Sequence, residues 1–211
     1  MTAAHFLEVR SDSSETKDIA RRVVSSAMRM SRMIDGLLDL TRARLAGGIP
    51  LQRSKADLGA LIHRVVQEHQ VAHPERLIEI VQEHKSDLNG HWDADRLAQV
   101  ASNLIGNAVQ HGATSEPVQV CLDGTHPEVV VMSVINTGTI APDMLPHVFD
   151  PFRGVQREAG SHQGLGLGLY IVQQIVHAHK GRVEVESGGA SRTVFRVTVP
   201  RQLSPALQEQ G

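Results

Sequence analysis

Cysteines, aromatic residues and long apolar runs are scarce in this sequence. Cys121 is the one cysteine among 211 residues, which excludes a disulfide framework and a cysteine zinc cluster within the chain. No apolar run approaches the roughly 18 residues of a membrane-spanning helix, and the start, MTAAHFLEVRSDSSE, is too polar for a signal peptide. We therefore expect a cytoplasmic protein with no membrane segment in this chain.

An excess of positive charge is also missing. The 21 Lys and Arg residues are matched by 23 Asp and Glu residues, and the formal net charge is -2. A general nucleic-acid binder would have a strongly basic surface, so we expect no nucleic-acid partner. Because 41% of the residues are hydrophobic but 3% are aromatic, the core must consist mostly of Leu, Ile, Val and Ala.

The first part of the chain has one long helical pattern, over residues 15–46. Its apolar residues recur at steps of three and four: Ile19, Val23, Ala27, Met30, Ile34, Leu37, Leu38 and Leu45. Gly47, Gly48 and Pro50 end the pattern. Such a stripe needs a partner helix, so we expect a homodimer through this amphipathic helix. The alternative is a single surface helix on a globular core.

Short strands and helices alternate from residue 50 to residue 200. The pattern predicts strands at 51–56, 76–82, 91–92, 118–122, 129–135, 183–186 and 193–199, and helices at 57–71, 93–111 and 168–179. Residues 136–167 are rich in Gly, Pro and His and are predicted to be irregular. This order favours an α+β fold, a mixed sheet with helices on one face.

A run of alternate glycines precedes the last predicted helix. Gly164, Gly166 and Gly168 would let a backbone approach a ligand closely, and the free N–H groups of a helix start attract phosphate. The run is neither a dinucleotide-binding fingerprint, whose third glycine would fall at Leu169, nor a P-loop, which needs Gly-Lys-Ser/Thr. Taken alone, it is equally well a flexible hinge before a helix.

Two asparagines lie four residues apart in the predicted helix 93–111. Asn103 and Asn107 would share one helix face among apolar neighbours, although asparagine is a poor helix former. A carboxamide oxygen can ligate Mg²⁺, which usually binds together with nucleotide phosphates. The alternative is that both amides bond to nearby backbone groups.

Three further segments carry polar or aromatic groups at turns and strand ends. In Asn136-Thr137-Gly138, a side-chain acceptor could meet the amine of a base, or simply start a turn. Phe149-Asp150-Pro151-Phe152-Arg153 is a stiff aromatic segment before a polar stretch, and Thr193 places a hydroxyl on a strand. The histidines are dispersed, and His177 and His179 would face different sides of one helix, so we expect no histidine metal site.

In their order and spacing, these five elements resemble the ATP-binding domain of two-component sensor histidine kinases. Residues 95–111 match the N box of that family, 136–138 its first glycine box, 149–153 its F box, 164–172 its second glycine box and 193–195 its last box. The resemblance covers residues 15–200. It implies a two-layer α/β sandwich of the Bergerat ATPase type, the fold shared with gyrase and MutL.

The resemblance also implies a domain division and a set of site residues. Residues 1–48 would be part of the dimerisation and phosphotransfer hairpin, 49–201 the ATP-binding domain and 202–211 a flexible tail. The cofactors would be ATP and Mg²⁺, with Asn107 as the metal ligand. ATP would contact Asn103, Asn107, Gln110, His111, Asn136, Gly138, Ile140, Phe152, Arg153, Gly164, Leu165, Gly166, Leu167, Gly168, Leu169 and Thr193.

The implied activity is transfer of the γ-phosphoryl group of ATP to a histidine, for relay to the receiver domain of a response regulator. Three residues depart from the pattern: Asn136 replaces an Asp, Gln110 a basic residue and Arg192 a Gly. The segment with the acceptor histidine is absent, so we expect a fragment that cannot phosphorylate itself.

The alternatives are a degenerate module for nucleotide sensing or dimerisation, and a protein-serine kinase with the same fold that regulates a sigma factor. Kinases of the second type lack a long N-terminal helix.

Overall fold

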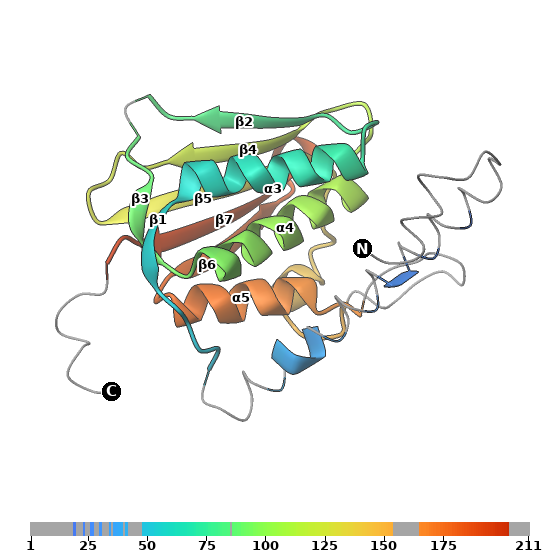
Figure 1. Ribbon diagram of the computed structural model, residues 1–211. Helices are drawn as coiled ribbons and strands as arrows, with labels where there is room; N and C mark the ends of the chain where they lie inside the picture. The colour runs from blue at the N-terminus through green and yellow to red at the C-terminus, as the bar shows by residue number, and fades with distance from the viewer. Residues whose placement is uncertain are drawn as a thin grey trace.

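A five-stranded sheet with three helices on one face makes up most of the computed structural model (Figure 1). The structure describes residues 48–84, 86–153 and 165–202, together with positions 19, 23, 26, 27, 30, 34, 36–39 and 41. The strands of the sheet are β2 (Ile78–Gln82), β4 (Val118–Asp123), β5 (Val129–Thr137), β6 (Arg182–Ser187) and β7 (Arg192–Pro200). The helices are α3 (Leu58–Ala72), α4 (Ala94–His111) and α5 (Gly168–Ala178).

The strand order is β2-β4-β5-β7-β6, with β2 parallel to β4 and the other pairs antiparallel. A second, two-stranded sheet joins β1 (Ser54–Asp57) to β3 (Asn89–Trp92). Two 3-10 turns, η1 (Leu145–His147) and η3 (Gly189–Ser191), lie in the connections. This two-layer arrangement confirms the predicted α+β fold with helices on one face.

The core lies between the sheet and the helices. Alternate residues of β4, β5 and β7 point into it, which follows from the period of two along a strand. Phe195 and Trp92 are fully buried, and the Trp92 indole N–H donates to the carbonyl of Pro200 at 2.6 Å. Apart from His179, the other large fully buried side chains are Ile, Leu and Val, as the composition predicted.

Aspartates cap the starts of both long helices. The Asp57 carboxylate accepts from the N–H of Gly59 at 2.8 Å, and the Asp93 carboxylate accepts from the N–H of Arg96 at 3.1 Å. Each bond satisfies an N–H group that has no partner within the helix.

Several boundaries differ from the prediction by one to three residues, and two of these differences have a clear physical cause. The first strand begins at Ser54 rather than Leu51, because Gln52 donates its N–H to Asp93 and Arg53 binds the end of α5 instead of a strand. Strand β5 continues through Asn136 to Thr137, since Asn136 pairs with Thr193 of β7.

After β7, Arg201 binds the backbone of two neighbouring connections. Its guanidinium donates to the carbonyls of Asn89 at 2.6 Å and Gly124 at 2.8 Å, and to those of Asp87 and His126. The C-terminal end of the sheet is thereby joined to the segments before β3 and after β4.

The described positions from Ile19 to Thr41 are all helical, as the apolar stripe predicted. Several predicted segments lie outside the described residues. They are the other residues of the predicted helix 15–46, most of the segment 1–48, residues 154–164 and the tail from 203. Within the described part of the chain, no helix has the length and apolar character that crossing a bilayer requires.

Candidate functional site

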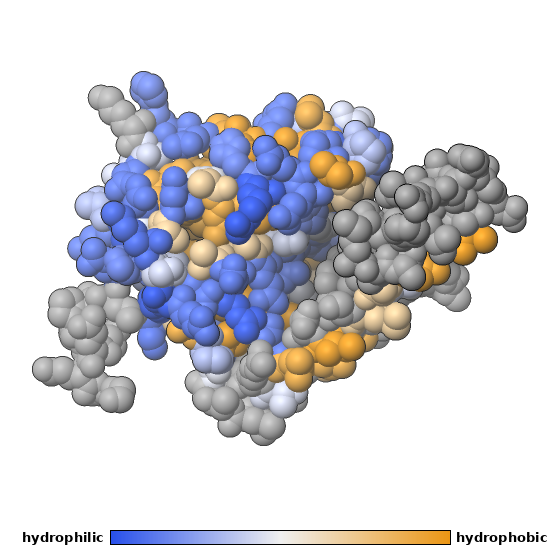
Figure 2. All heavy atoms as spheres, in the orientation of Figure 1, coloured by the Kyte–Doolittle hydropathy of each residue, from blue (hydrophilic) through white to orange (hydrophobic). Residues whose placement is uncertain are grey.

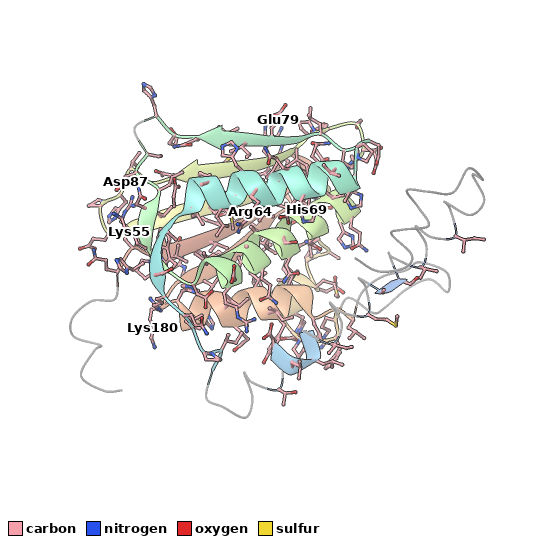
Figure 3. All side chains as sticks on the ribbon, in the orientation of Figure 1. Lys55, Arg64, His69, Glu79, Asp87 and Lys180 are labelled. Atoms are coloured by element: carbon pink, nitrogen blue, oxygen red, sulfur yellow. The ribbon has the colours of Figure 1, made fainter. Side chains whose placement is uncertain are left out.

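One face of α4 carries a row of polar side chains. Arg96, Gln99, Asn103 and Asn107 follow one another at steps of three and four, so they share this face. The opposite face is buried in the core and consists of Leu97, Val100, Ala101, Leu104, Ile105 and Ala108. On a flank of α4, Ser102 bonds to His69 of α3 at 3.0 Å (Figure 3).

The start of α5 lies against the polar row at Asn103. The Asn103 amide donates to the carbonyl of Gly168 at 3.4 Å, and a Cβ atom on Gly168 would stand 3.6 Å from Asn103 Oδ1. A larger residue at 168 would therefore fill the space next to the amide. Asn107, one turn further along, is half-buried and has no hydrogen-bond partner among the described residues.

The segment before α5 has a special backbone conformation. Gly166 has a φ of 67°, and its carbonyl accepts from the N–H of Phe152, whose φ is also 67°. Leu167 precedes the helix and provides no side-chain cap, so among the described residues no side-chain cap satisfies the first N–H groups of α5. An uncapped helix start of this kind attracts anions.

Asn136 lies at the other end of the candidate site, on β5. It is buried, and its amide donates to the carbonyl of Thr137 at 2.8 Å. Its carbonyl oxygen accepts no hydrogen bond from the described residues, which leaves an acceptor for a ligand. Gly138 follows with a φ of 110°, and a Cβ there would stand 3.2 Å from the carbonyl of His111. A side chain at 138 would meet both strain and crowding.

Thr193 joins β7 to the turn at Gly138. Its hydroxyl donates to the carbonyl of Gly138 at 2.9 Å and lies 3.0 Å from the hydroxyl of Ser187, which accepts from the N–H of Ile140 at 2.7 Å. Our sequence analysis missed Ser187. The signal for it was its place in the hairpin, since Ser187 pairs directly with Thr193 across β6 and β7.

Our sequence analysis also missed a buried arginine behind Asn136. Arg76 is 3% exposed, and it donates to the carbonyl of Ala113 at 2.6 Å while its Nε and Nη2 atoms have no partner among the described residues. A Cβ on Gly112 would stand 2.9 Å from Arg76 Nη2 and 3.1 Å from Asn136 Cβ, so the two side chains are neighbours. Nothing in the sequence distinguishes Arg76 from an exposed residue at the start of a strand.

Some predicted site residues are not brought into contact with this group. Phe152 and Arg153 are exposed, and Arg153 Nε lies 3.7 Å from the carboxylate of Asp150, which also bonds to His147 at 2.8 Å. Gln110 is exposed near the end of α4. The carbonyl of His111 faces Gly138, whereas its imidazole ring is solvent-accessible, and desolvation lowers the pKa of this ring.

Of the glycine run, Leu165 and Leu169 pack on the core, whereas Gly164 lies outside the described residues. In the described ranges, no group of three or more His, Cys, Asp or Glu side chains could hold a metal ion. His179 is a core residue that accepts from the N–H of Asp93 at 3.1 Å. A metal at this site would therefore need amide and ligand oxygens.

A family model described as "Histidine kinase-, DNA gyrase B-, and HSP90-like ATPase" matches residues 92–203. The chain belongs to this family. The match runs from the start of α4 to the end of β7 and so contains Asn103, Asn107, Asn136 and the glycine segment. Membership in this ATPase family supports ATP binding by the domain and confirms the Bergerat-type fold.

Among curated proteins, the chain is 34% identical over 180 residues to the bacteriophytochrome of Pseudomonas aeruginosa, covering 83% of this chain and 24% of that protein. It is 37% identical over 201 residues to the sensor histidine kinase TrcS of Mycobacterium tuberculosis, covering 90% of this chain and 38% of that protein. The chain thus spans about a quarter to two fifths of these ATPase relatives.

Among solved structures, full-length ShkA in complex with AMPPNP is 26% identical with a TM-score of 0.70, over 93% of this chain and 41% of that one. The catalytic domain of the histidine kinase ThkA, in a nucleotide-free form, has a TM-score of 0.59 at 24% identity, over 71% of this chain and 98% of that one. The ThkA likeness supports the fold of the ATPase domain alone.

Proposed function

We propose that this chain is the ATP-binding catalytic part of a sensor histidine kinase. In the whole protein, the γ-phosphoryl group of ATP would pass to a histidine and then to the receiver domain of a response regulator. The observation that carries the proposal is the position of Asn103 against Gly168, beside the uncapped start of α5. The sensor-kinase relatives named above, which match most of this chain, support the same reaction class.

The described residues fit a nucleotide with a magnesium ion. The oxygens of Asn103 and Asn107 are hard ligands of the kind Mg²⁺ prefers, and we assign Asn107 as the protein ligand. The N–H groups at the start of α5 would bind phosphate oxygens, and the free carbonyl oxygen of Asn136 would accept from the adenine amine. Bound Mg²⁺ would neutralise phosphate charge and help to orient the transferred group.

The N-terminal helix would mediate association with a second copy of the chain. Ile19, Val23, Met30 and Ile34 are each more than half exposed. Hydrophobic atoms gather at the lower edge of Figure 2, over the short helical segment drawn in blue in Figure 1. We propose that this stripe pairs with a second copy in a homodimer. The division into 1–48, 49–201 and 202–211 and the cytoplasmic location belong to the same proposal.

Calorimetric titration with Mg·AMPPNP tests the proposed site. The wild-type chain should bind, and Asn107→Ala should weaken binding at least about tenfold because a metal ligand is lost. Asn89→Ala is the matched control: it removes the same kind of amide from an exposed position in β3, outside the candidate site, and should leave the affinity unchanged. No binding by the wild-type chain at millimolar nucleotide would contradict the proposal and favour the degenerate module.

Asn136→Asp distinguishes an active site from a degenerate one. A carboxylate accepts a stronger, charge-assisted bond from the adenine amine, but Asp cannot make the bond that Asn136 donates to Thr137. We expect a gain in Mg·AMPPNP affinity of less than about tenfold, because the two bonds differ by about 1 kcal/mol. A gain of a hundredfold or more would show that Asn136 disables the site.

Labelling with radioactive ATP tests the missing acceptor. We expect no phosphohistidine on this chain by itself, and the appearance of one would refute our reading of it as a fragment.

A further inference from the structure

A buried arginine lies beside Asn136, at the end of the candidate site opposite the glycine segment. Arg76 is 3% exposed, and its Nη1 atom donates to the carbonyl of Ala113 at 2.6 Å. Its Nε and Nη2 atoms have no partner among the described residues, and no carboxylate of this part of the chain forms an ion pair with it. Native proteins bond nearly all their buried polar groups, so the free donors of Arg76 point to an acceptor that a ligand brings.

Backbone bonds on both sides of Arg76 fix its position. The side-chain amide of Gln70 on α3 donates to the carbonyl of Arg76 at 2.6 Å, and its oxygen accepts from the N–H of Ile78 at 3.2 Å. The N–H of Arg76 donates to the carbonyl of His73 at 3.0 Å. The partial negative charge at the end of α4 stabilises a cation nearby. The guanidinium is therefore held where the start of β2 meets the end of α4 (Figure 1).

Gly112 leaves the guanidinium and the Asn136 side chain in direct proximity. A Cβ atom at 112 would stand 2.9 Å from Arg76 Nη2 and 3.1 Å from Asn136 Cβ. Any side chain at 112 would therefore come between these two residues. Because the surroundings are buried, the charge of Arg76 is weakly screened and acts on a group that Asn136 binds.

The free polar groups at this end of the site are mostly donors. The hydroxyl hydrogens of Thr193 and Ser187 are used within the fold, one on the carbonyl of Gly138 and one between the two hydroxyls. Asn136 keeps its carbonyl oxygen and one amide hydrogen after its bond to the next carbonyl. To these the Nε and Nη2 atoms of Arg76 add only N–H donors. Such a set suits a ligand that presents an acceptor.

We propose that Arg76 is a specificity-determining residue, through which the site binds a 6-oxopurine nucleotide such as GTP as well as ATP. The proposal rests on the proposed function, in which the base lies against Asn136. The oxo group of guanine is an acceptor, whereas the corresponding amine of adenine is a donor. The Asn136 carboxamide serves either base because it both accepts and donates, and the positive charge of Arg76 favours the oxo group.

Calorimetric titration of the full chain with Mg·GMPPNP and with Mg·AMPPNP tests the specificity. The two analogues have the same ribose, phosphates and metal, so the ratio of their dissociation constants depends on the base alone. We expect the wild-type chain to bind Mg·GMPPNP no more than about tenfold more weakly than Mg·AMPPNP. A larger preference for Mg·AMPPNP would overturn the proposal.

Arg76→Met tests the arginine itself. Methionine keeps an unbranched side chain without charge or N–H donors, so Mg·GMPPNP binding should weaken at least about fivefold more than Mg·AMPPNP binding. Arg64→Met is the matched control: Arg64 is exposed on α3 (Figure 3), the net charge changes equally, and the ratio should stay as in the wild type. A loss of folded protein lowers the apparent stoichiometry for both analogues and leaves the ratio unchanged. An unchanged ratio in Arg76→Met would refute the role of Arg76.

Asn136→Asp gives a second test at the neighbouring position. A carboxylate only accepts, and it neutralises the charge of Arg76 and repels an oxo group, so Mg·GMPPNP binding should weaken more than about tenfold relative to Mg·AMPPNP binding. Equal effects on the two analogues would contradict the assigned recognition. If the wild-type chain binds neither analogue at millimolar concentration, the proposed function and this inference fail together. Binding of Mg·AMPPNP without Mg·GMPPNP refutes the inference alone.

Discussion

The two ends of α4 differ in how their polar groups are bonded. At the start, the Asp93 carboxylate accepts from the N–H groups of Gln52 and Arg96, and the Asp93 N–H donates to buried His179. Towards the end, Asn107 has no partner among the described residues and Asn103 makes one long bond of 3.4 Å. Native proteins bond nearly all their buried polar groups. The bonded end therefore serves folding, and the open amides are available to a ligand.

This difference predicts where a substitution changes stability and where it changes binding. Changes at Asp93 should lower the free energy of unfolding and leave the nucleotide affinity of the folded chain unaltered. Changes at Asn107 should lower the nucleotide affinity and leave the free energy of unfolding unaltered. Three measurements test this contrast.

Asp93→Ala should have the largest effect on stability. It removes the cap of α4 and leaves the N–H groups of Gln52 and Arg96 without an acceptor, at a cost of about 2–4 kcal/mol. Urea unfolding measures the change. Asp95→Ala, exposed in the same turn, is the control and should cost less than about 1 kcal/mol. Equal costs for the two variants would break the contrast.

Gly138→Ala should have a smaller effect, near the nucleotide end. Its φ of 110° strains any side chain, and the new Cβ would stand 3.2 Å from the carbonyl of His111, so we expect a loss of about 2 kcal/mol. Gly48→Ala separates strain from crowding, because Gly48 has a φ of 140° but nothing within 4 Å of its Cβ position. A Gly138 variant no less stable than the Gly48 variant would show that crowding is unimportant.

Lowering the pH should reduce the free energy of unfolding by a smaller amount than these substitutions, through His179, which bonds to Asp93 at the start of α4. Burial lowers the pKa of His179 below its usual 6.5, so the unfolded chain binds the proton more readily than the folded chain. Stability should be constant above about pH 7.5 and fall as the pH drops through 6.5. His111 acts in the same direction.

Melting temperatures between pH 5 and 8 check this prediction. His179→Gln should flatten the profile, whereas the exposed His63→Gln should leave it unchanged. A wild-type melting temperature that is independent of pH below 6.5 would contradict the assignment of His179 as a neutral core residue.

Much of the fold could be predicted from the sequence because local signals agreed with each other. The strands predicted at 118–122 and 193–199 and the helices predicted at 57–71 and 93–111 match β4, β7, α3 and α4 within one residue at each end. The start of β1 was wrong because Gln52 and Arg53 bind groups more than 40 and 120 residues away in the chain. Contacts between residues so far apart produce no periodic pattern in the local sequence.

The site shows the same limit. Asn103 and Gly168 could be brought together from their motifs, since each carries a residue type that is unusual for its position. Arg76 could not, because it acts through a tertiary neighbour rather than through a pattern of its own, whereas Ser187 could have been found from its pairing with Thr193 in the hairpin. Likewise, the apolar stripe of the N-terminal helix gave no sign that Asp39, on its other side, would be buried.

The bonds of Arg201 have a practical consequence for anyone who shortens or fuses this protein. Four carbonyl groups, from two segments that are more than 70 residues away in the sequence, accept hydrogen bonds from the one guanidinium of Arg201, which follows the last strand. A version that stops at Pro200 would keep every helix and strand of the fold, yet it would leave those carbonyls without their shared donor. Tags and fusion partners are therefore best attached beyond residue 202.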